Sequence, residues 1–157
     1  EEAEALQGLY IDEPADLVIV SSGGYPFDID LYQAVKAVSA TYGAVRPGGG
    51  LILVADLPEG LGYPDFGTTL LKAMDDFGSA LEEVRQNFTI PSFIALKTVK
   101  NLRELNSALV TSKTDIEYPG MVTRSLDEAF RRIAKEVKPK KAVVIPSGNS
   151  IALKVRA

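Results

Sequence analysis

The sequence predicts a three-layer α/β fold with a mainly parallel sheet of four or five strands. Short apolar runs without polar interruptions alternate along the chain with longer segments whose apolar residues recur at helical spacing. An unbroken apolar run is typical of a strand that helices cover on both faces. The length of 157 residues, with 46% apolar and 24% charged residues, fits one globular domain spanning residues 1–157.

The strands of this sheet are expected where the chain is most continuously apolar. Leu17–Val20 is the clearest case, because it consists only of leucine, valine and isoleucine. The full set of expected strands is 17–20, 51–55, 108–112 and 142–145, with an edge strand in the tail 151–155. Their alternation with helices makes the predicted arrangement Rossmann-like.

The expected helices lie between these strands. The first full helix follows the turn 21–26, and either Asp28 or Asp30 suits its N-cap because a carboxylate accepts hydrogen bonds from first-turn amides. The glycine-rich segment 46–50 is expected to be a turn that ends this helix. The predicted helices cover about 1–10, 28–45, 68–76, 79–86, 91–105 and 125–137, with 113–124 irregular. Ser125 and Glu128 have the spacing of a capping box at the start of the last helix.

The chain contains no cysteine and no histidine. Disulfides, thiolate metal sites and cysteine nucleophiles are therefore excluded. The commonest general base and the commonest transition-metal ligand are also absent. Any metal site would depend on carboxylates, which suit magnesium, calcium or manganese better than nickel or zinc. We expect no metal site in this chain.

Charge and hydropathy limit the class of partner. The net charge is −4 with both signs interspersed, which argues against a nucleic-acid surface. No apolar run reaches the roughly 18 residues that a membrane span needs. No signal peptide is visible, and the acidic start lacks methionine, so we expect part of a longer protein. A chain without cysteine suits the cytoplasm, where we expect the protein.

A ligand site is expected at the carboxyl ends of the strands, as in other open parallel sheets. Four polar or glycine-bearing segments follow strands, namely 21–25, 56–62, 112–114 and 146–149. Ser22, Gly23 and Gly24 could hold an anion on backbone amides close to a helix N-terminus. The alternative is a tight turn between strand and helix that simply requires glycine.

Three polar side chains lie together on the helix after this turn. Tyr32 and Lys36 are one helical turn apart, and Gln33 adjoins both. An ammonium, an amide and a phenol could bind a carboxylate and a hydroxyl group. Such residues are also ordinary on the exposed face of a helix. Asp56 and Glu59 could act as general acids or metal ligands, or be solvated loop carboxylates.

These segments resemble the C-terminal domain of the nickel-pincer lactate racemase family. Residues 16–37, DLVIVSSGGYPFDIDLYQAVKA, follow its pattern of a strand, then S-x-G-G-x-P-x-D, then Y-Q-x-x-K. Residues 46–62, RPGGGLILVADLPEGLG, are similar to its second glycine-rich region. Residues 142–150, AVVIPSGNS, are similar to its P-x-G ending. Leu57 stands where the family has cysteine, and the family's aromatic residue over the substrate has no secure counterpart.

The resemblance implies the substrate-side half of a two-domain protein that racemises or epimerises lactate or another 2-hydroxy acid. Gln33 and Lys36 would bind the substrate and Tyr32 would line its pocket. A nickel-pincer nucleotide and the histidines that relay protons would belong to the N-terminal domain, which is the expected partner. Because this chain has no histidine, we expect no catalytic residue, no bound cofactor and no activity in isolation.

Two other interpretations remain open. One is a non-catalytic binding or interaction domain of the same fold. The other is an independent nucleotide-binding domain, against which the absence of a G-x-G-x-x-G fingerprint argues.

Overall fold

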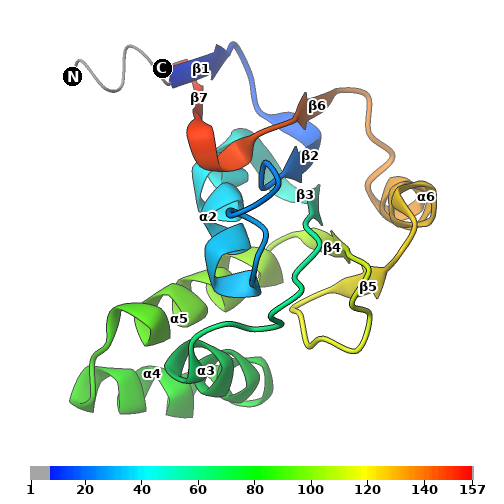
Figure 1. Cartoon of the computed structure of the whole chain (residues 1–157). Coiled ribbons are helices and arrows are strands. Elements are labelled where there is room, and N and C mark those ends of the chain that lie inside the picture. Colours follow the sequence, from blue (N-terminus) through cyan, green and yellow to red (C-terminus); the bar gives the residue numbers. More distant parts are fainter. Residues whose placement is uncertain (1–7, 157) are drawn as a thin grey trace.

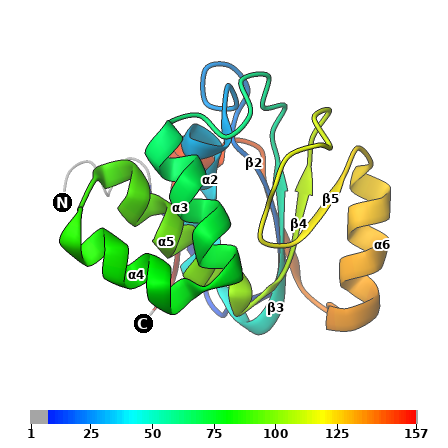
Figure 2. The same cartoon turned by 90° about the horizontal axis from the view of Figure 1, so that it is seen from below.

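The computed structural model describes residues 8–156. Within them a five-stranded parallel sheet has the order β5-β4-β3-β2-β6, and β1 pairs with β7 in a separate two-stranded parallel sheet (Figure 1). Helices α2, α3, α4 and α5 lie on one side of the larger sheet and α6 lies on the other (Figure 2). The predicted α/β fold with a parallel sheet is confirmed.

The elements have the following bounds. The strands are β1 (Gly8–Ile11), β2 (Ala15–Ser21), β3 (Val45–Val54), β4 (Asn106–Val110), β5 (Met121–Thr123), β6 (Ala142–Ile145) and β7 (Ala152–Val155). The helices are α2 (Leu31–Thr41), α3 (Pro64–Asp75), α4 (Phe77–Gln86), α5 (Ile90–Arg103) and α6 (Leu126–Val137), with single 3₁₀ turns η1 (Tyr42–Ala44) and η2 (Gly148–Ser150).

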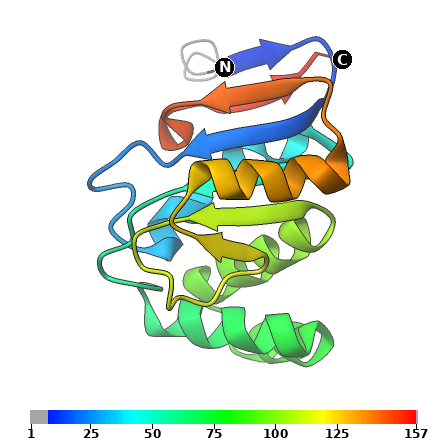
Figure 3. The same ribbon diagram turned by 90° about the vertical axis from the view of Figure 1, so that its right-hand side faces the viewer.

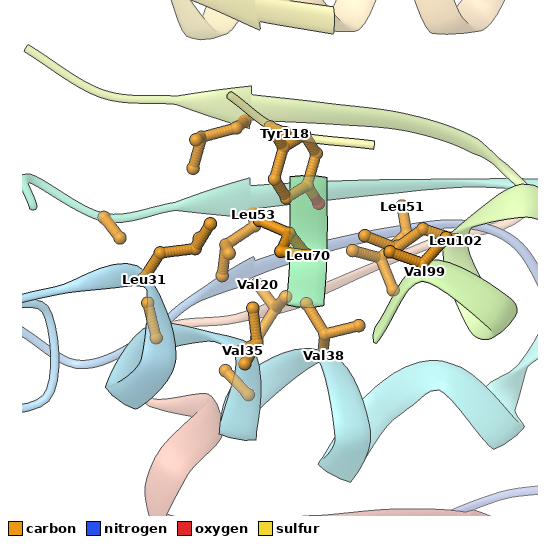
Figure 4. Packing of buried hydrophobic residues seen from close by; sticks show 14 of the residues in the cluster. Val20, Leu31, Val35, Val38, Leu51, Leu53, Leu70, Val99, Leu102 and Tyr118 are labelled. Carbon is orange, nitrogen blue, oxygen red and sulfur yellow. The ribbon is translucent and has the colours of Figure 1, made fainter. Parts of the chain in front are cut away.

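The central strands bury both faces, as their unbroken apolar sequences predict. In β3, Leu51 and Leu53 belong to the core under α2, α3 and α5, whereas Ile52 belongs to the smaller core under α6. This alternation follows from the two-residue repeat of a strand. Figure 4 shows the larger core, in which side chains from β2, β3 and three helices meet.

Gly50 in β3 allows α6 to approach the sheet closely. A Cβ atom at this position would lie 2.5 Å from Cγ2 of Ile133 and 2.9 Å from Cδ1 of Leu17. The segment 46–50 is therefore not the helix-ending turn that its glycines suggest. It lies inside β3, where the pairing with β2 passes from Ala15–Val45 to Leu17–Gly50, so that the residues between leave the ladder.

Three further sequence predictions need correction. The predicted helix over 1–10 is wrong for residues 8–10, which belong to β1, and its remainder lies outside the described residues. The segment 113–124 is not wholly irregular, because it contains β5. Ser125 does cap α6, but the carboxylate of Glu128 accepts from Oγ1 of Thr123 at 2.6 Å instead of returning to the Ser125 amide.

Asp16 joins three separate segments at the amino end of the sheet. Its Oδ1 accepts from Nε of Arg46 at 2.5 Å, and its Oδ2 accepts from the amides of Lys140 and Lys141 at 2.8 and 2.9 Å. The Arg46 hydrogen bond and then the two amides lower the pKa of Asp16 to about 2. The carboxylate thus fixes the start of β2 against β3 and the entry to β6.

The direction in which strands are added reverses once. From β2 the chain adds β3, β4 and β5 on one side, and α6 then returns it to β6 on the other side of β2 (Figure 3). The carboxyl ends of β2 and β6 are therefore the place where a crevice is expected in such a sheet. Within residues 8–156, no helix is both long enough and apolar enough to cross a membrane.

Candidate functional site

The loops beyond β2 and β3 form one connected wall at the carboxyl edge of the sheet. The amide of Leu57 donates to the carbonyl of Asp28 at 2.8 Å, and the amide of Glu59 donates to the carbonyl of Ile29 at 2.9 Å. These backbone bonds hold the segments 22–30 and 55–62 together. The first side chains of α2 therefore stand on a supported surface.

The amino end of α2 is already saturated with hydrogen bonds. The Asp30 carboxylate caps it by accepting from the Gln33 amide at 2.7 Å, which resolves the choice between Asp28 and Asp30. The amides of Leu31 and Tyr32 donate to loop carbonyls, at 2.8 Å to Gly60 and 3.3 Å to Leu61. In this conformation these amides are not open to an anion.

The three residues of the glycine turn after β2 differ in their burial and packing. Ser22 is fully buried, and its Oγ lies 3.5 Å from the carbonyl of Val54, so it belongs to the sheet and does not face a ligand. Gly23 is exposed, has a φ of 107°, and packs against Ser147. Gly24 has a φ of 78° and open space where a side chain would lie. Of the three predicted loop residues, Gly24 lines an open cleft.

Tyr32, Gln33 and Lys36 meet on the outer face of α2. Lys36 is exposed, while Tyr32 and Gln33 are half-buried. The Lys36 ammonium donates to Oε1 of Gln33 at 2.5 Å and lies 5.6 Å from the centre of the Tyr32 ring. An ammonium, an amide and an aromatic ring are thus available to one small ligand.

Aromatic contacts fix the position of Tyr32. Its ring meets Tyr63 edge-on at 4.9 Å and Phe66 edge-on at 5.6 Å between ring centres. Phe66 is fully buried, so Tyr32 is anchored to the core through α3. Such aromatic pairs each stabilise a structure by about 0.5–1.5 kcal/mol beyond their burial.

Asn149 supports the same helix from the other side. Its Nδ2 donates to the carbonyl of Gln33 at 3.3 Å, and Gly148 beside it packs on Ala37 so closely that a Cβ would lie 2.7 Å from the Ala37 methyl. Oδ1 of Asn149 is buried and has no hydrogen-bond partner among the described residues. The segment after β6, predicted as part of the ligand edge, therefore holds α2 in place.

A cleft of about 430 Å³ lies over the ends of β3 and β4, on the β5 side of β2. Polar residues at or beyond the carboxyl ends of four strands line it, namely Ser21, Asp28, Asp56, Thr111, Ser112 and Arg124. Nε of Arg124 donates to the carbonyl of Ser112 at 3.2 Å. Sequence reasoning missed Arg124 because it did not detect β5, whose carboxyl end this residue follows.

A second hollow, of about 330 Å³, lies beside Gln33. Asp30, Glu59, Gly62, Tyr63 and Pro64 complete its lining. Lys36 and Tyr32 do not line either hollow, and the cleft over β3 and β4 does not include Gln33. Of the predicted substrate residues, Gln33 alone lines the second hollow, whereas Gly24 lines the first.

The donor groups of this chain do not fit a nickel centre. Histidine and cysteine are absent from the sequence. Among residues 8–156, no three carboxylates gather closely enough to hold a metal ion. Asp56 is held by Oγ of Ser112, and Oγ1 of Thr111 donates to its carbonyl at 2.7 Å, so its placement in the loop has a structural explanation.

The fold and this edge define a class: a parallel α/β domain that presents polar loops and one helix face beyond the carboxyl ends of its strands. Residues 11–153 match the family model of the lactate racemase C-terminal domain, and the chain belongs to this family.

Two curated relatives are lactate racemases. The chain is 30% identical to the one from Thermoanaerobacterium thermosaccharolyticum over 151 residues, covering 90% of this chain and 35% of the relative. It is 30% identical to the one from Lactiplantibacillus plantarum over 154 residues, covering 88% of this chain and 35% of the relative. The chain thus spans about a third of the length of these relatives.

Solved structures agree with the fold. The lactate racemase apoprotein from T. thermosaccharolyticum superposes with a TM-score of 0.81 at 25% identity, covering 99% of this chain and 39% of that one. A protein from Thermotoga maritima superposes with a TM-score of 0.56 at 16% identity, covering 98% and 40%, which supports the fold alone.

Proposed function

We propose that this chain is the substrate-side domain of a two-domain racemase or epimerase that acts on lactate or another 2-hydroxy acid. The observation that carries the proposal is the pairing of Lys36 and Gln33 on the exposed face of α2, with 2.5 Å between Nζ and Oε1. A 2-hydroxy acid offers a carboxylate and a hydroxyl on adjacent carbons, and this pair offers a cation and an amide side by side that could bind them.

In this proposal Lys36 binds the substrate carboxylate through a charge-assisted hydrogen bond. The amide of Gln33 binds the hydroxyl, since it can both donate and accept. Tyr32 forms the adjacent wall, and its anchoring on Phe66 keeps it in place when the substrate arrives. Gly23 and Gly24 allow close approach to the loop beside the first cleft. Ser22 has no direct role, because it is buried.

The reaction itself needs groups outside this chain. We infer that the N-terminal domain would hold a nickel-pincer nucleotide, which would supply hydride-transfer chemistry, together with the histidines that would move protons. This chain supplies neither a histidine nor a thiolate, so the isolated domain is expected to be inactive. We further propose that the whole protein is cytoplasmic, binds no nucleic acid and has its N-terminal domain as the partner of the α2 face.

The test uses the full-length protein loaded with its cofactor. Lys36→Ala should lower kcat/KM for the substrate by about 10- to 100-fold, the range for losing a hydrogen bond to a charged group. Lys36→Arg should restore part of it. Lys135→Ala is the matched control, because Lys135 is an exposed lysine on α6, on the opposite side of the sheet.

Unchanged kcat/KM in Lys36→Ala would remove the proposed role of Lys36. Binding of a 2-hydroxy acid without turnover by the loaded full-length protein would favour the alternative, a binding domain of the same fold.

A further inference from the structure

The hollow beside Gln33 has a polar lining that the proposed contacts with a 2-hydroxy acid leave unused. Lys36 and Gln33 account for the carboxylate and the 2-hydroxyl, which all such acids share. The hollow of about 330 Å³ starts at Gln33 and extends over Glu59 and Tyr63. Whatever group the substrate carries on carbon 3 would enter this space.

The floor of the hollow is rigid. Gly62 has a φ of 88°, and a Cβ atom there would lie 2.7 Å from Cγ of Asp30. Oδ1 of Asp30 is committed to capping α2. The backbone of Glu59 is tied to the carbonyl of Ile29, as described above. A side chain larger than hydrogen at Gly62 would fill the space between Asp30 and the loop, so glycine keeps the hollow open.

The wall presents two accessible polar groups. Tyr63 is 55% exposed, while its ring is braced edge-on against Tyr32 at 4.9 Å. Glu59 is exposed, so its carboxylate can accept from a ligand hydroxyl. Both groups sit on the loop that leads into α3, one residue before its first turn in the case of Tyr63.

The charges around the hollow disfavour a charged substrate tail. The carboxylates of Asp30 and Glu59 would repel a second carboxylate. The ammonium of Lys36 lies next to Gln33, and Nζ of Lys113 reaches the carbonyl of Pro58 at 3.3 Å on the same loop. Neither lysine lines the hollow, whereas both carboxylates do, so an uncharged tail that donates hydrogen bonds fits this space better than an anionic one.

We propose that this hollow is a subsite for the substrate tail and that it selects 2-hydroxy acids carrying a further hydroxyl group on the carbon chain. The proposal rests on the proposed function, because it assumes that Lys36 and Gln33 hold the carboxylate end. Glu59 accepts from the additional hydroxyl, and the Tyr63 phenol contacts the same oxygen or the next one. The methyl group of lactate cannot form these hydrogen bonds, so the Glu59 carboxylate and the Tyr63 phenol would remain bound to water.

The experiment compares three substrates with the cofactor-loaded full-length protein. They are lactate, 2,3-dihydroxypropanoate and the dicarboxylic acid 2-hydroxybutanedioate. The expected kcat/KM is about tenfold higher for the dihydroxy acid than for lactate, as for one added hydrogen bond to a charged group. The dicarboxylic acid should be the poorest of the three.

Single substitutions test which residues cause the preference for the dihydroxy acid. Glu59→Ala should lower the ratio of the dihydroxy acid to lactate to about one, and Tyr63→Phe should lower it partly. Glu136→Ala is the control, because Glu136 is an exposed carboxylate on α6. It should leave the ratio unchanged. Unfolding midpoints of all variants establish that each is folded.

A preference for lactate, or a ratio that is the same in Glu59→Ala and the wild type, would overturn the subsite. The failure of the proposed function looks different. In that case no 2-hydroxy acid is racemised at all, or Lys36→Ala has no effect on any of them.

Discussion

The backbone of Gly23 lies directly against the side chain of Ser147, so that a Cβ atom on Gly23 would come 2.7 Å from the Ser147 Oγ. The two residues follow β2 and β6, the neighbouring strands where the strand order reverses. Open parallel sheets usually carry a ligand crevice at this point. Here Gly23 packs against Ser147 at this point, and an open cleft lies over the ends of β3 and β4.

This contact predicts unequal effects of two similar substitutions. Gly23→Ala and Gly24→Ala both place a side chain at positive φ, which costs about 1–2 kcal/mol. Only Gly23→Ala also displaces the Ser147 hydroxyl from its hydrogen bond with Oγ of Ser150, adding about 0.5–1.5 kcal/mol. Urea unfolding should therefore rank Gly23→Ala as the less stable. Adding Ser147→Ala should recover the difference, and equal stabilities of the two single variants would contradict the contact.

Asp16 predicts a pH-dependent contribution to stability. Its pKa is about 2 in the folded protein, against an ordinary value of 3.8. A carboxylate with a lowered pKa stabilises the folded state above its unfolded pKa and loses this effect as the pH falls toward the folded value. The difference in unfolding free energy between wild type and Asp16→Asn should thus be constant above about pH 4 to 5 and shrink toward pH 2.

The same titration in an Arg46→Ala background provides the control. Arg46 is the largest cause of the lowered pKa of Asp16, so the effect of Asp16→Asn should be smaller there and shrink over a narrower pH range. A difference that does not vary between pH 6 and pH 2 would show that these hydrogen bonds do not form in solution.

Tyr118 predicts a stabilising substitution. It is 3% exposed in the core of Figure 4, and its hydroxyl has no hydrogen-bond partner among the described residues. Burial also raises the pKa of this phenol above its ordinary value. Tyr118→Phe removes the unpaired hydroxyl and should raise the free energy of unfolding by about 1–3 kcal/mol.

The matched control is Tyr42→Phe. The Tyr42 hydroxyl donates to the Glu104 carboxylate at the surface, so its removal should leave stability unchanged or slightly lower. Both variants are measured by thermal or urea unfolding at neutral pH. Destabilisation by Tyr118→Phe would mean that an internal water or another group satisfies the hydroxyl.

The sequence predicts the four apolar strands because each is long enough and apolar enough to show its pattern alone. β5 has three residues, and β1 exists by pairing with β7 at the far end of the chain. β5 is too short to show an apolar pattern, and β1 leaves no local signal because its partner strand is distant in sequence. The glycines 48–50 misled for a related reason: Gly50 is required by Ile133 of α6, which local sequence does not reveal.

The candidate site, like the fold, could be predicted only in part from the sequence. Helical spacing places Tyr32 and Lys36 on one face, and the structure brings their side chains together with Gln33. Spacing does not reveal that Tyr63 joins Tyr32 or that Asn149 holds the Gln33 carbonyl. Both contacts depend on how the loops after β3 and β6 fold over α2.

The parallel pairing of β1 with β7 has a mechanical consequence. Gly8 lies beside Ala152 and Ile11 beside Val155, so the chain enters this small sheet at one end and leaves it at the other. A force that pulled residues 8 and 155 apart would act along both strands and load all of their hydrogen bonds at the same time. The two-stranded sheet of β1 and β7 would resist such tension as a unit, because its hydrogen bonds would have to break together and not one after another.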